Sequence, residues 1–207
     1  MVTERFTQLT GRIAAMPAAN IDTDVIMPKA FLKGIDRAGL ALGLFHDLRF
    51  DMEGRRRPEF LLHRADMADT RFLLVGPNFG CGSSREHAVW GMLQYGIRAI
   101  IGTGFAGIFA DNAANNGLLL IVLDPIGMAS LAACLSNDAG LISIDLEKQT
   151  IVAGGISIDF EIDPEVRRAL LLGLDRIGDT LTHAAEIHSF QQAYLAEHPW
   201  LVEAAVR

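Results

Sequence analysis

The densest group of chemically useful side chains lies between Gly80 and His87, where the sequence reads Gly-Cys-Gly-Ser-Ser-Arg-Glu-His. This segment follows an apolar run that ends at Gly76-Pro77 and precedes a stretch with helical character, so we expect a strand-to-helix turn. Ser83 stands three residues before Glu86, a spacing that matches a capping box at the start of a helix. The free N–H groups of such a first turn favour a bound anion.

Several groups in this segment suit a carboxylate ligand. Gly80 and Gly82 permit positive φ and let a ligand approach the backbone closely. Arg85 supplies a planar, permanently charged fork that matches carboxylate geometry, and Ser83 and Ser84 supply two hydroxyls. Hydroxyls, free amides and one guanidinium therefore converge where a small carboxylic acid can lie.

Each of these residues also has a plainer interpretation. Ser83 can be a helix cap and nothing more, and Arg85 can be a solvated helix residue. His87 can be a satisfied histidine beneath the loop, and Cys81 between two glycines can be a small buried filler. The density of polar groups and glycine, rather than any single residue, favours the ligand site.

The bulk properties exclude several classes of protein. The chain has 207 residues, half of them apolar, and a net charge of −7, which argues against nucleic acid or an anionic membrane as the main partner. Its two cysteines, Cys81 and Cys134, form no disulfide framework and supply too few thiolates for a zinc or iron–sulfur site. The longest aliphatic run, 118–123, is far shorter than the roughly 20 residues of a membrane span, and no signal peptide is recognisable. A cytoplasmic chain is expected.

The order of expected elements places the Ser83 segment in an α/β domain. Strands alternate with helices in the first part, which predicts a parallel sheet, and alternating apolar residues later predict hairpins separated by Gly154-Gly155. Asp163-Pro164-Glu165 should begin a helix. We expect one domain over 1–207, with a core of 1–165 and a helical extension of 166–207. The expected strands are 9–16, 72–75, 99–101, 118–123, 142–146 and two that begin at Ile151 and Ile156, on either side of Gly154-Gly155. The other expected helices are 39–46, 84–95, 105–115 and 178–197.

The nine residues from Gly80 to Ala88 resemble the signature of the swivelling domain of the aconitase family. The segments that extend this resemblance are 20–29, 31–33, 105–109, 116–119, 175–181 and 198–200. Over nearly its whole length the chain is thus similar to the small subunits of isopropylmalate dehydratases. The resemblance implies a swivelling domain of three layers, β/β/α, like the fourth domain of aconitase, with a C-terminal helical extension.

The resemblance also implies a reaction and a partner. In that family the small subunit pairs with a large subunit that carries a [4Fe–4S] cluster, and one iron acts as a Lewis acid on the substrate hydroxyl. The implied activity is that of a hydro-lyase, active only with the large subunit, which isomerises 2-isopropylmalate and 3-isopropylmalate through isopropylmaleate in leucine biosynthesis. The two cysteines of this chain fit a cluster supplied by another polypeptide.

The family's roles pass to particular residues here. Ser83 would be the base that takes the proton next to a carboxylate, with backbone amides stabilising its alkoxide. Asp24 and Lys29 lie in the opening loop and would order the site or contact the partner, although a loop-capping aspartate and a solvated lysine remain alternatives. The expected substrate-binding residues are Gly82, Ser84 and Arg85, and the expected supporting residues are Asp24, Lys29, Cys81 and His87, with no metal ligand among them.

Three positions depart from the family pattern. Gly104 stands where the family usually has serine, Gly107 where it has an acid and Leu120 where it has proline. Gly104 and Gly107 adjoin what is expected to be the rim of the site, so a related hydro-lyase acting on citraconate or a methyl-substituted malate is a second hypothesis. The polar stretch over 20–60 is expected to close only against the partner.

Two hypotheses come from other classes of protein. Cys81 at a strand-to-helix turn, with His87 as its base, would suit a cysteine hydrolase or amidotransferase. A non-catalytic, anion-binding regulatory subunit would keep the same loop and need no metal-bearing partner. The match of the surrounding residues favours the hydro-lyase over both.

Overall fold

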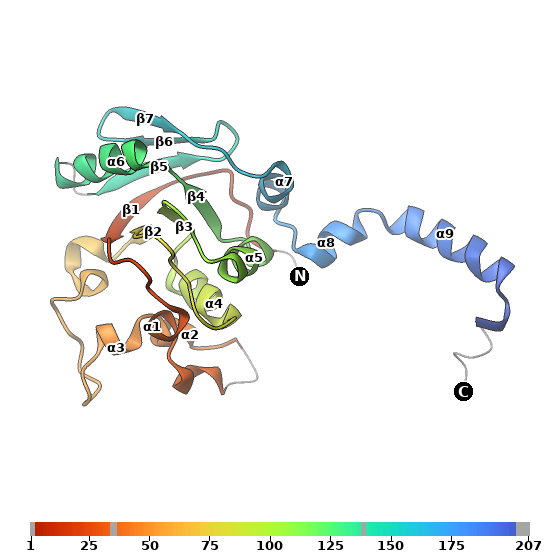
Figure 1. Ribbon diagram of the computed structural model, residues 1–207, viewed down its shortest axis with the longest axis horizontal. Coiled ribbons are helices and arrows are strands. Elements are labelled where there is room, and N and C mark those ends of the chain that lie inside the picture. The colour runs from red at the N-terminus through yellow and green to blue at the C-terminus, as the bar shows by residue number, and fades with distance from the viewer. Residues whose placement is uncertain (1–2, 34–36, 138–139, 202–207) are drawn as a thin grey trace.

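The computed structural model of the protein describes residues 3–33, 37–137 and 140–201. Its centre is a seven-stranded sheet in the order β4-β3-β2-β1-β5-β6-β7 (Figure 1). The first four strands run parallel and are β1 (Gln8–Met16), β2 (Thr70–Val75), β3 (Ala99–Gly102) and β4 (Leu119–Val122). The last three are antiparallel and are β5 (Leu141–Asp145), β6 (Thr150–Ala153) and β7 (Ile156–Asp159).

The parallel half determines where the Ser83 segment leaves the sheet. β2 and β3 are apolar almost throughout and buried, as expected for strands that are covered on both faces. In the register of β1 and β2, Met16 lies opposite Val75. The two strands therefore end at the same edge, and the loops that follow them start side by side.

Helices and short turns surround this sheet. The α-helices are α1 (Thr23–Ile26), α2 (Leu40–Gly43), α3 (His46–Arg49), α4 (Glu86–Tyr95), α5 (Gly107–Asn116), α6 (Pro125–Asn137), α7 (Pro164–Leu172), α8 (Arg176–Leu181) and α9 (Ala184–Glu197). The 3₁₀ turns are η1 (Lys29–Leu32), η2 (Leu61–His63) and η3 (Ala65–Met67). None of the helices formed by the described residues has the length and apolar character needed to cross a bilayer.

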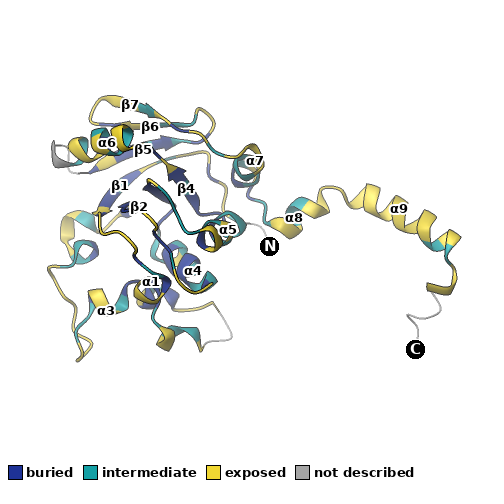
Figure 2. Cartoon of the chain, in the orientation of Figure 1, coloured by how far each residue is buried: buried dark blue, intermediate teal, exposed yellow. Residues whose placement is uncertain are grey.

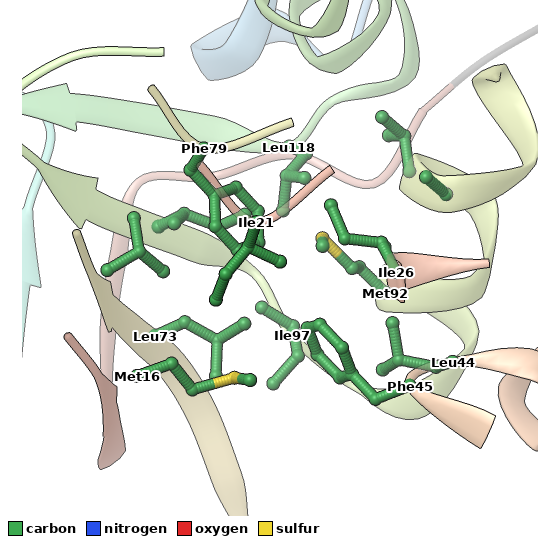
Figure 3. Packing of buried hydrophobic residues seen from close by; sticks show 14 of the residues in the cluster. Met16, Ile21, Ile26, Leu44, Phe45, Leu73, Phe79, Met92, Ile97 and Leu118 are labelled. Atoms are coloured by element: carbon green, nitrogen blue, oxygen red, sulfur yellow. The ribbon is translucent and has the colours of Figure 1, made fainter. Parts of the chain in front are cut away.

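Two clusters of buried side chains lie on opposite sides of the parallel half. The first joins the sheet to α1, α2 and α4, and Figure 3 shows Ile21 and Phe79, from the two loops that follow β1 and β2, packed together in it. The second contains Leu74 and Ile101 from the parallel half and Ile144 and Ile151 from the antiparallel half. The sheet therefore curls around this second cluster, which confirms the predicted β/β/α layering.

The predicted hairpins and the helix after Asp163 are confirmed. The Asp163 carboxylate accepts hydrogen bonds from the backbone N–H groups of Glu165 and Val166, at 2.9 and 3.1 Å. Leu170 of α7 belongs to the second core cluster, so part of the predicted extension over 166–207 packs into the core. The division at 165/166 stays a prediction.

Two helical predictions differ from the structure, and one helix was not predicted. The segment 39–46 contains α2 and only the first residue of α3, because Phe45 between the two helices takes a left-handed backbone conformation with φ of 49°. The segment 178–197 divides into parts of α8 and α9. Helix α6 was not predicted, although Asp124 caps it by accepting a hydrogen bond from the Gly127 N–H at 2.7 Å.

The last two helices differ in burial from the rest of the chain. All residues of α9 except Leu195 are exposed, as are most residues of α8. Helix α9 extends away from the body (Figures 1 and 2). We call residues 176–201 the C-terminal arm. Its large apolar side chains remain in contact with water, including Phe190 at 70% exposure and Trp200 at 61%.

Candidate active site

The opening loop and the Ser83 loop, separated by some 60 residues in sequence, lie against each other. The Thr23 N–H donates to the Cys81 carbonyl at 2.9 Å, and the Gly80 N–H donates to the Ile21 carbonyl at 2.8 Å. At the base, the Asn78 side-chain amide donates to the Asn20 side-chain oxygen at 2.8 Å. The structure therefore brings together the two segments that the sequence analysis selected.

The Ser83 loop needs glycine at two positions. Gly80 and Gly82 have φ values of 77° and 90°, a region that side chains with Cβ rarely adopt. At Gly80 a Cβ atom would also overlap the ring of Phe109, which comes from α5. The loop therefore packs closely against α5, and this contact helps to fix the position of the loop.

The predicted capping box at Ser83 is wrong. Helix α4 begins at Glu86, and its N-cap is Arg85, which has an extended backbone and makes no side-chain cap. The Glu86 carboxylate accepts a hydrogen bond from the Asn116 side-chain amide at 2.6 Å. This tertiary partner competes with the local cap, and Ser83 is an exposed residue that does not cap the helix.

Arg85 is buried, with 7% of its surface exposed, so the alternative of a solvated helix residue is wrong. Its Nη1 lies 2.5 Å from the Asp24 carboxylate and donates to the Met27 carbonyl at 3.3 Å. The hydrogen bond from Arg85 lowers the pKa of Asp24, and the positive charge of Lys29 adds to the effect. A charged pair therefore connects the opening loop to the end of the Ser83 loop.

Asp24 is not the capping aspartate of its loop. Asp22 has that role, since its carboxylate accepts a hydrogen bond from the Val25 N–H at 2.8 Å and forms the N-cap of α1. Asp24 is therefore available to pair with Arg85, and Lys29 is an exposed residue of η1 nearby.

Cys81 and His87 are both half-buried, but they have different surroundings. Cys81 lies in the bridge with Asp22, whereas the His87 ring packs on Trp90 with the ring centroids 4.7 Å apart. No hydrogen bond or ion pair between Cys81 and His87 is found in the described part of the chain. The geometry gives no support to the cysteine hydrolase.

Thr23, which is 2% exposed, was not among the site residues predicted from the sequence. Its hydroxyl donates to the Ser83 carbonyl at 2.9 Å, from the opening loop to the Ser83 loop. Its position between Asp22 and Asp24 was only a weak indication of a role in the site, because residues next to one another in a loop tend to contact the same neighbouring segment. Neither its burial nor its partner could be read from that position.

The departures from the family pattern lie in two places. The Ala106 N–H donates to the Phe79 carbonyl at 3.0 Å, so the stretch with Gly104 and Gly107 adjoins the Ser83 loop. A Cβ at Gly104 or at Gly107 would have no atom within 4 Å, so both glycines leave open space there. Leu120 instead lines a cavity of about 230 Å³ between α5, β4 and α7.

Cysteine placement tests whether this chain can hold an iron–sulfur cluster. Cys81 lies in the Ser83 loop, whereas Cys134 lies in α6 and packs beside the second core cluster. The described residues contain no group of three or more histidine, cysteine or acidic side chains suited to a metal. The residues present do not fit a cluster.

Comparison with known proteins defines the class of this fold and site. Residues 3–125 match the family described as the aconitase C-terminal domain. The chain is 51% identical to 3-isopropylmalate dehydratase small subunit 1 of Mannheimia succiniciproducens, over 96% of this chain and 98% of that protein. It is 45% identical to the 3-isopropylmalate dehydratase small subunit of Caulobacter vibrioides, over 95% of this chain and 98% of that protein.

A solved structure agrees with these relatives. The crystal structure of 3-isopropylmalate dehydratase from Methanocaldococcus jannaschii superposes with a TM-score of 0.64 and 27% identity, covering 89% of this chain and 99% of that one. The chain belongs to the 3-isopropylmalate dehydratase small subunits of the aconitase family. The predicted fold and the predicted hydro-lyase class are confirmed. The individual roles given to Ser83 and its neighbours remain predictions.

Proposed function

We propose that this chain, joined to a larger subunit, interconverts 2-isopropylmalate and 3-isopropylmalate through isopropylmaleate, with Ser83 as the base. The names of the relatives support the substrate and the need for a larger subunit. Because its own cysteines do not fit a cluster, we assign the [4Fe–4S] cluster to the larger subunit and derive no step through it. A cytoplasmic location is part of the same proposal.

The contribution of this chain is proton transfer and substrate orientation. Ser83, ionised to the alkoxide, would take the proton from the carbon next to a substrate carboxylate, and its hydroxyl would return that proton in the hydration direction. Arg85, held by Asp24, and the exposed Ser84 and Gly82 would bind that carboxylate. The negative charge that develops after proton loss would then lie beside a guanidinium and backbone amides.

One observation carries this proposal. The opening loop binds the Ser83 loop, in which Ser83 is exposed while Arg85, two residues further along the chain, is buried. An exposed base on a rigid loop can act on a substrate that a second subunit covers. A buried Ser83 would have excluded that arrangement.

The test is co-expression with the larger subunit under anaerobic conditions, followed by loss of enoate absorbance with isopropylmaleate and with citraconate. We expect isopropylmaleate to be hydrated faster. Replacement of Ser83 by alanine should lower turnover by at least about a thousandfold and leave assembly intact. The matched control is Ser157→Ala, an exposed serine on β7, which should retain full turnover.

Two results would count against the proposal in different ways. Near-normal turnover of the Ser83→Ala complex would reject Ser83 as the base. Faster hydration of citraconate would favour the related hydro-lyase, and the open space at Gly104 and Gly107 is the observation that keeps that second function in view.

A further inference from the structure

Thr23 holds two carbonyl groups of the Ser83 loop at once. Its backbone N–H donates to the Cys81 carbonyl and its hydroxyl donates to the Ser83 carbonyl, both at 2.9 Å. These carbonyls stand on either side of Gly82, whose positive φ lets both of them turn toward Thr23. Thr23 itself is almost fully buried, so its hydroxyl is not competing with water for this bond.

The orientation of these carbonyls fixes the direction of two N–H groups. In a trans peptide the N–H points opposite to the C=O, and the described residues contain no cis peptide bond. The Gly82 N–H shares a peptide plane with the Cys81 carbonyl, and the Ser84 N–H shares one with the Ser83 carbonyl. Both N–H groups therefore point away from Thr23.

These two N–H groups lie where a ligand can reach them. Gly82, Ser83 and Ser84 are exposed, and neither N–H group has a hydrogen-bond acceptor within residues 3–33, 37–137 and 140–201. Backbone N–H groups that are close in sequence and point to the same side of a loop can bind an anion together. The two donors belong to the residues immediately before and after Ser83, so a ligand that they hold lies close to this residue.

We propose that Thr23 is a positioning residue that directs the N–H groups of Gly82 and Ser84 at the substrate carboxylate. Negative charge builds up on that carboxylate when the Ser83 alkoxide takes the proton of the neighbouring carbon and the electron pair of the broken C–H bond stays on the substrate. This inference rests on the proposed function of the Ser83 loop. Thr23 itself contacts neither the substrate nor the reacting atoms, and it acts by orienting the two peptide planes that carry the donors. Preorganised donors of this kind favour the transition state because they need no reorientation during the reaction.

The neighbours of Thr23 explain why one short turn can hold the loop so firmly. Asp22 caps α1, Thr23 is the first residue of α1, and Asp24 pairs with Arg85. Three consecutive residues thus fix the turn, the two peptide planes and the guanidinium. The β-branched side chain of Thr23 also restricts its χ1 angle, which keeps the hydroxyl on the Ser83 carbonyl.

The experiment compares Thr23→Val with Thr23→Ser in the assembled two-subunit enzyme, with isopropylmaleate as substrate. Valine removes the hydroxyl at nearly constant volume, whereas serine keeps it. We expect Thr23→Val to lower kcat about 10- to 100-fold with KM changed less than about threefold, because the donors act mainly in the transition state. Thr23→Ser should stay within about threefold of the wild type.

Thr70 provides a matched control. It is also 2% exposed, and its hydroxyl donates to the Met67 carbonyl at 2.7 Å, away from the Ser83 loop. Thr70→Val therefore removes the same kind of buried hydrogen bond and should leave kcat unchanged. Unchanged kcat in Thr23→Val, an equal loss in Thr70→Val, or an equal loss in Thr23→Ser would overturn the role of Thr23.

The wild-type assay separates this inference from the proposed function. If the wild-type complex hydrates neither enoate, the proposed function fails, and positioning is then judged from the backbone amide spectrum of the full chain. Thr23→Val should shift the Gly82 and Ser84 amide resonances, whereas Thr70→Val should not. Unshifted Gly82 and Ser84 resonances in Thr23→Val would reject the positioning role by itself.

Discussion

The paired loops of the site and the C-terminal arm differ in what keeps them ordered, and their compositions would suggest the reverse. The paired loops, residues 20–24 and 77–85, are polar and rich in glycine, yet hydrogen bonds and one ion pair tie them to each other and to the core. The arm is helical and carries large apolar side chains, yet its residues pack on little but one another. Order in the loops thus comes from partners distant in sequence, and order in the arm comes from local contacts.

Local contacts within the arm are aromatic. The Phe190 and Tyr194 rings stack with centroids 5.8 Å apart, and the Tyr194 and His198 rings stack at 4.3 Å. A helix of 14 residues without tertiary packing is of marginal stability in water. The comparison shows that the geometry of the site depends on packing against the core. The conformation of the arm, by contrast, can change without altering that geometry.

The largest expected effect tests the paired loops. Gly80→Ala should destabilise the fold by about 2–4 kcal/mol, because alanine is strained at this positive φ and its Cβ overlaps Phe109. Urea unfolding of the isolated chain measures the change. The matched control is Gly104→Ala, where a Cβ meets open space, and it should change stability by less than about 0.5 kcal/mol. Equal effects at the two glycines would remove the distinction between the tightly packed loop and its neighbour.

A smaller effect should appear with pH. Arg85 lowers the pKa of Asp24 below its usual value, so the ion pair contributes stability above about pH 4 and loses it as pH falls through the lowered pKa. Asp24→Asn should therefore be less stable than the wild type at neutral pH, and the two should converge in acid. The difference should be well below that of Gly80→Ala, because half of the Asp24 side chain is in water. Unfolding free energies measured from pH 3 to pH 7 would contradict this if the difference grew on acidification.

The smallest effect is expected from the arm. Removal of residues 183–207 should change the unfolding free energy of the remaining chain by less than about 0.5 kcal/mol, because α9 contributes no residue to either core cluster. A second truncation before Pro164 provides the contrast, since it removes Leu170 from the core and should unfold the chain. If both truncations lowered stability equally, the arm would belong to the core after all.

Sequence patterns predicted the sheet well because its strands have strong periodic signals. The runs at Phe72–Val75 and Ala99–Ile101 are buried strands, and the Asp163-Pro164 signal marks the true start of α7. These elements have local causes, namely apolar runs, capping groups and a proline at the first helical position. Local sequence patterns are sufficient to predict an element where the tertiary contacts favour the same structure.

The candidate site was only partly predictable, for a physical reason. The sequence identified the Ser83 segment and the opening loop, but it placed the start of α4 at Ser84 because it gave the Glu86 carboxylate a local partner. Asn116, thirty residues away, takes that carboxylate instead. Thr23 escaped notice for the same reason, since its partner is sixty residues away. Pairings of this kind leave no periodic trace in the chain.

The common edge at which β1 and β2 end has a consequence for biosynthesis. A nascent chain that stops short of residue 70 contains the opening loop but lacks the strand that aligns the Ser83 loop beside it. The two loops can meet only after β2 has been made and has paired with β1, so the site arises in the same cooperative step as the centre of the sheet. Ribosome-bound fragments of increasing length would thus gain protection of both loops together.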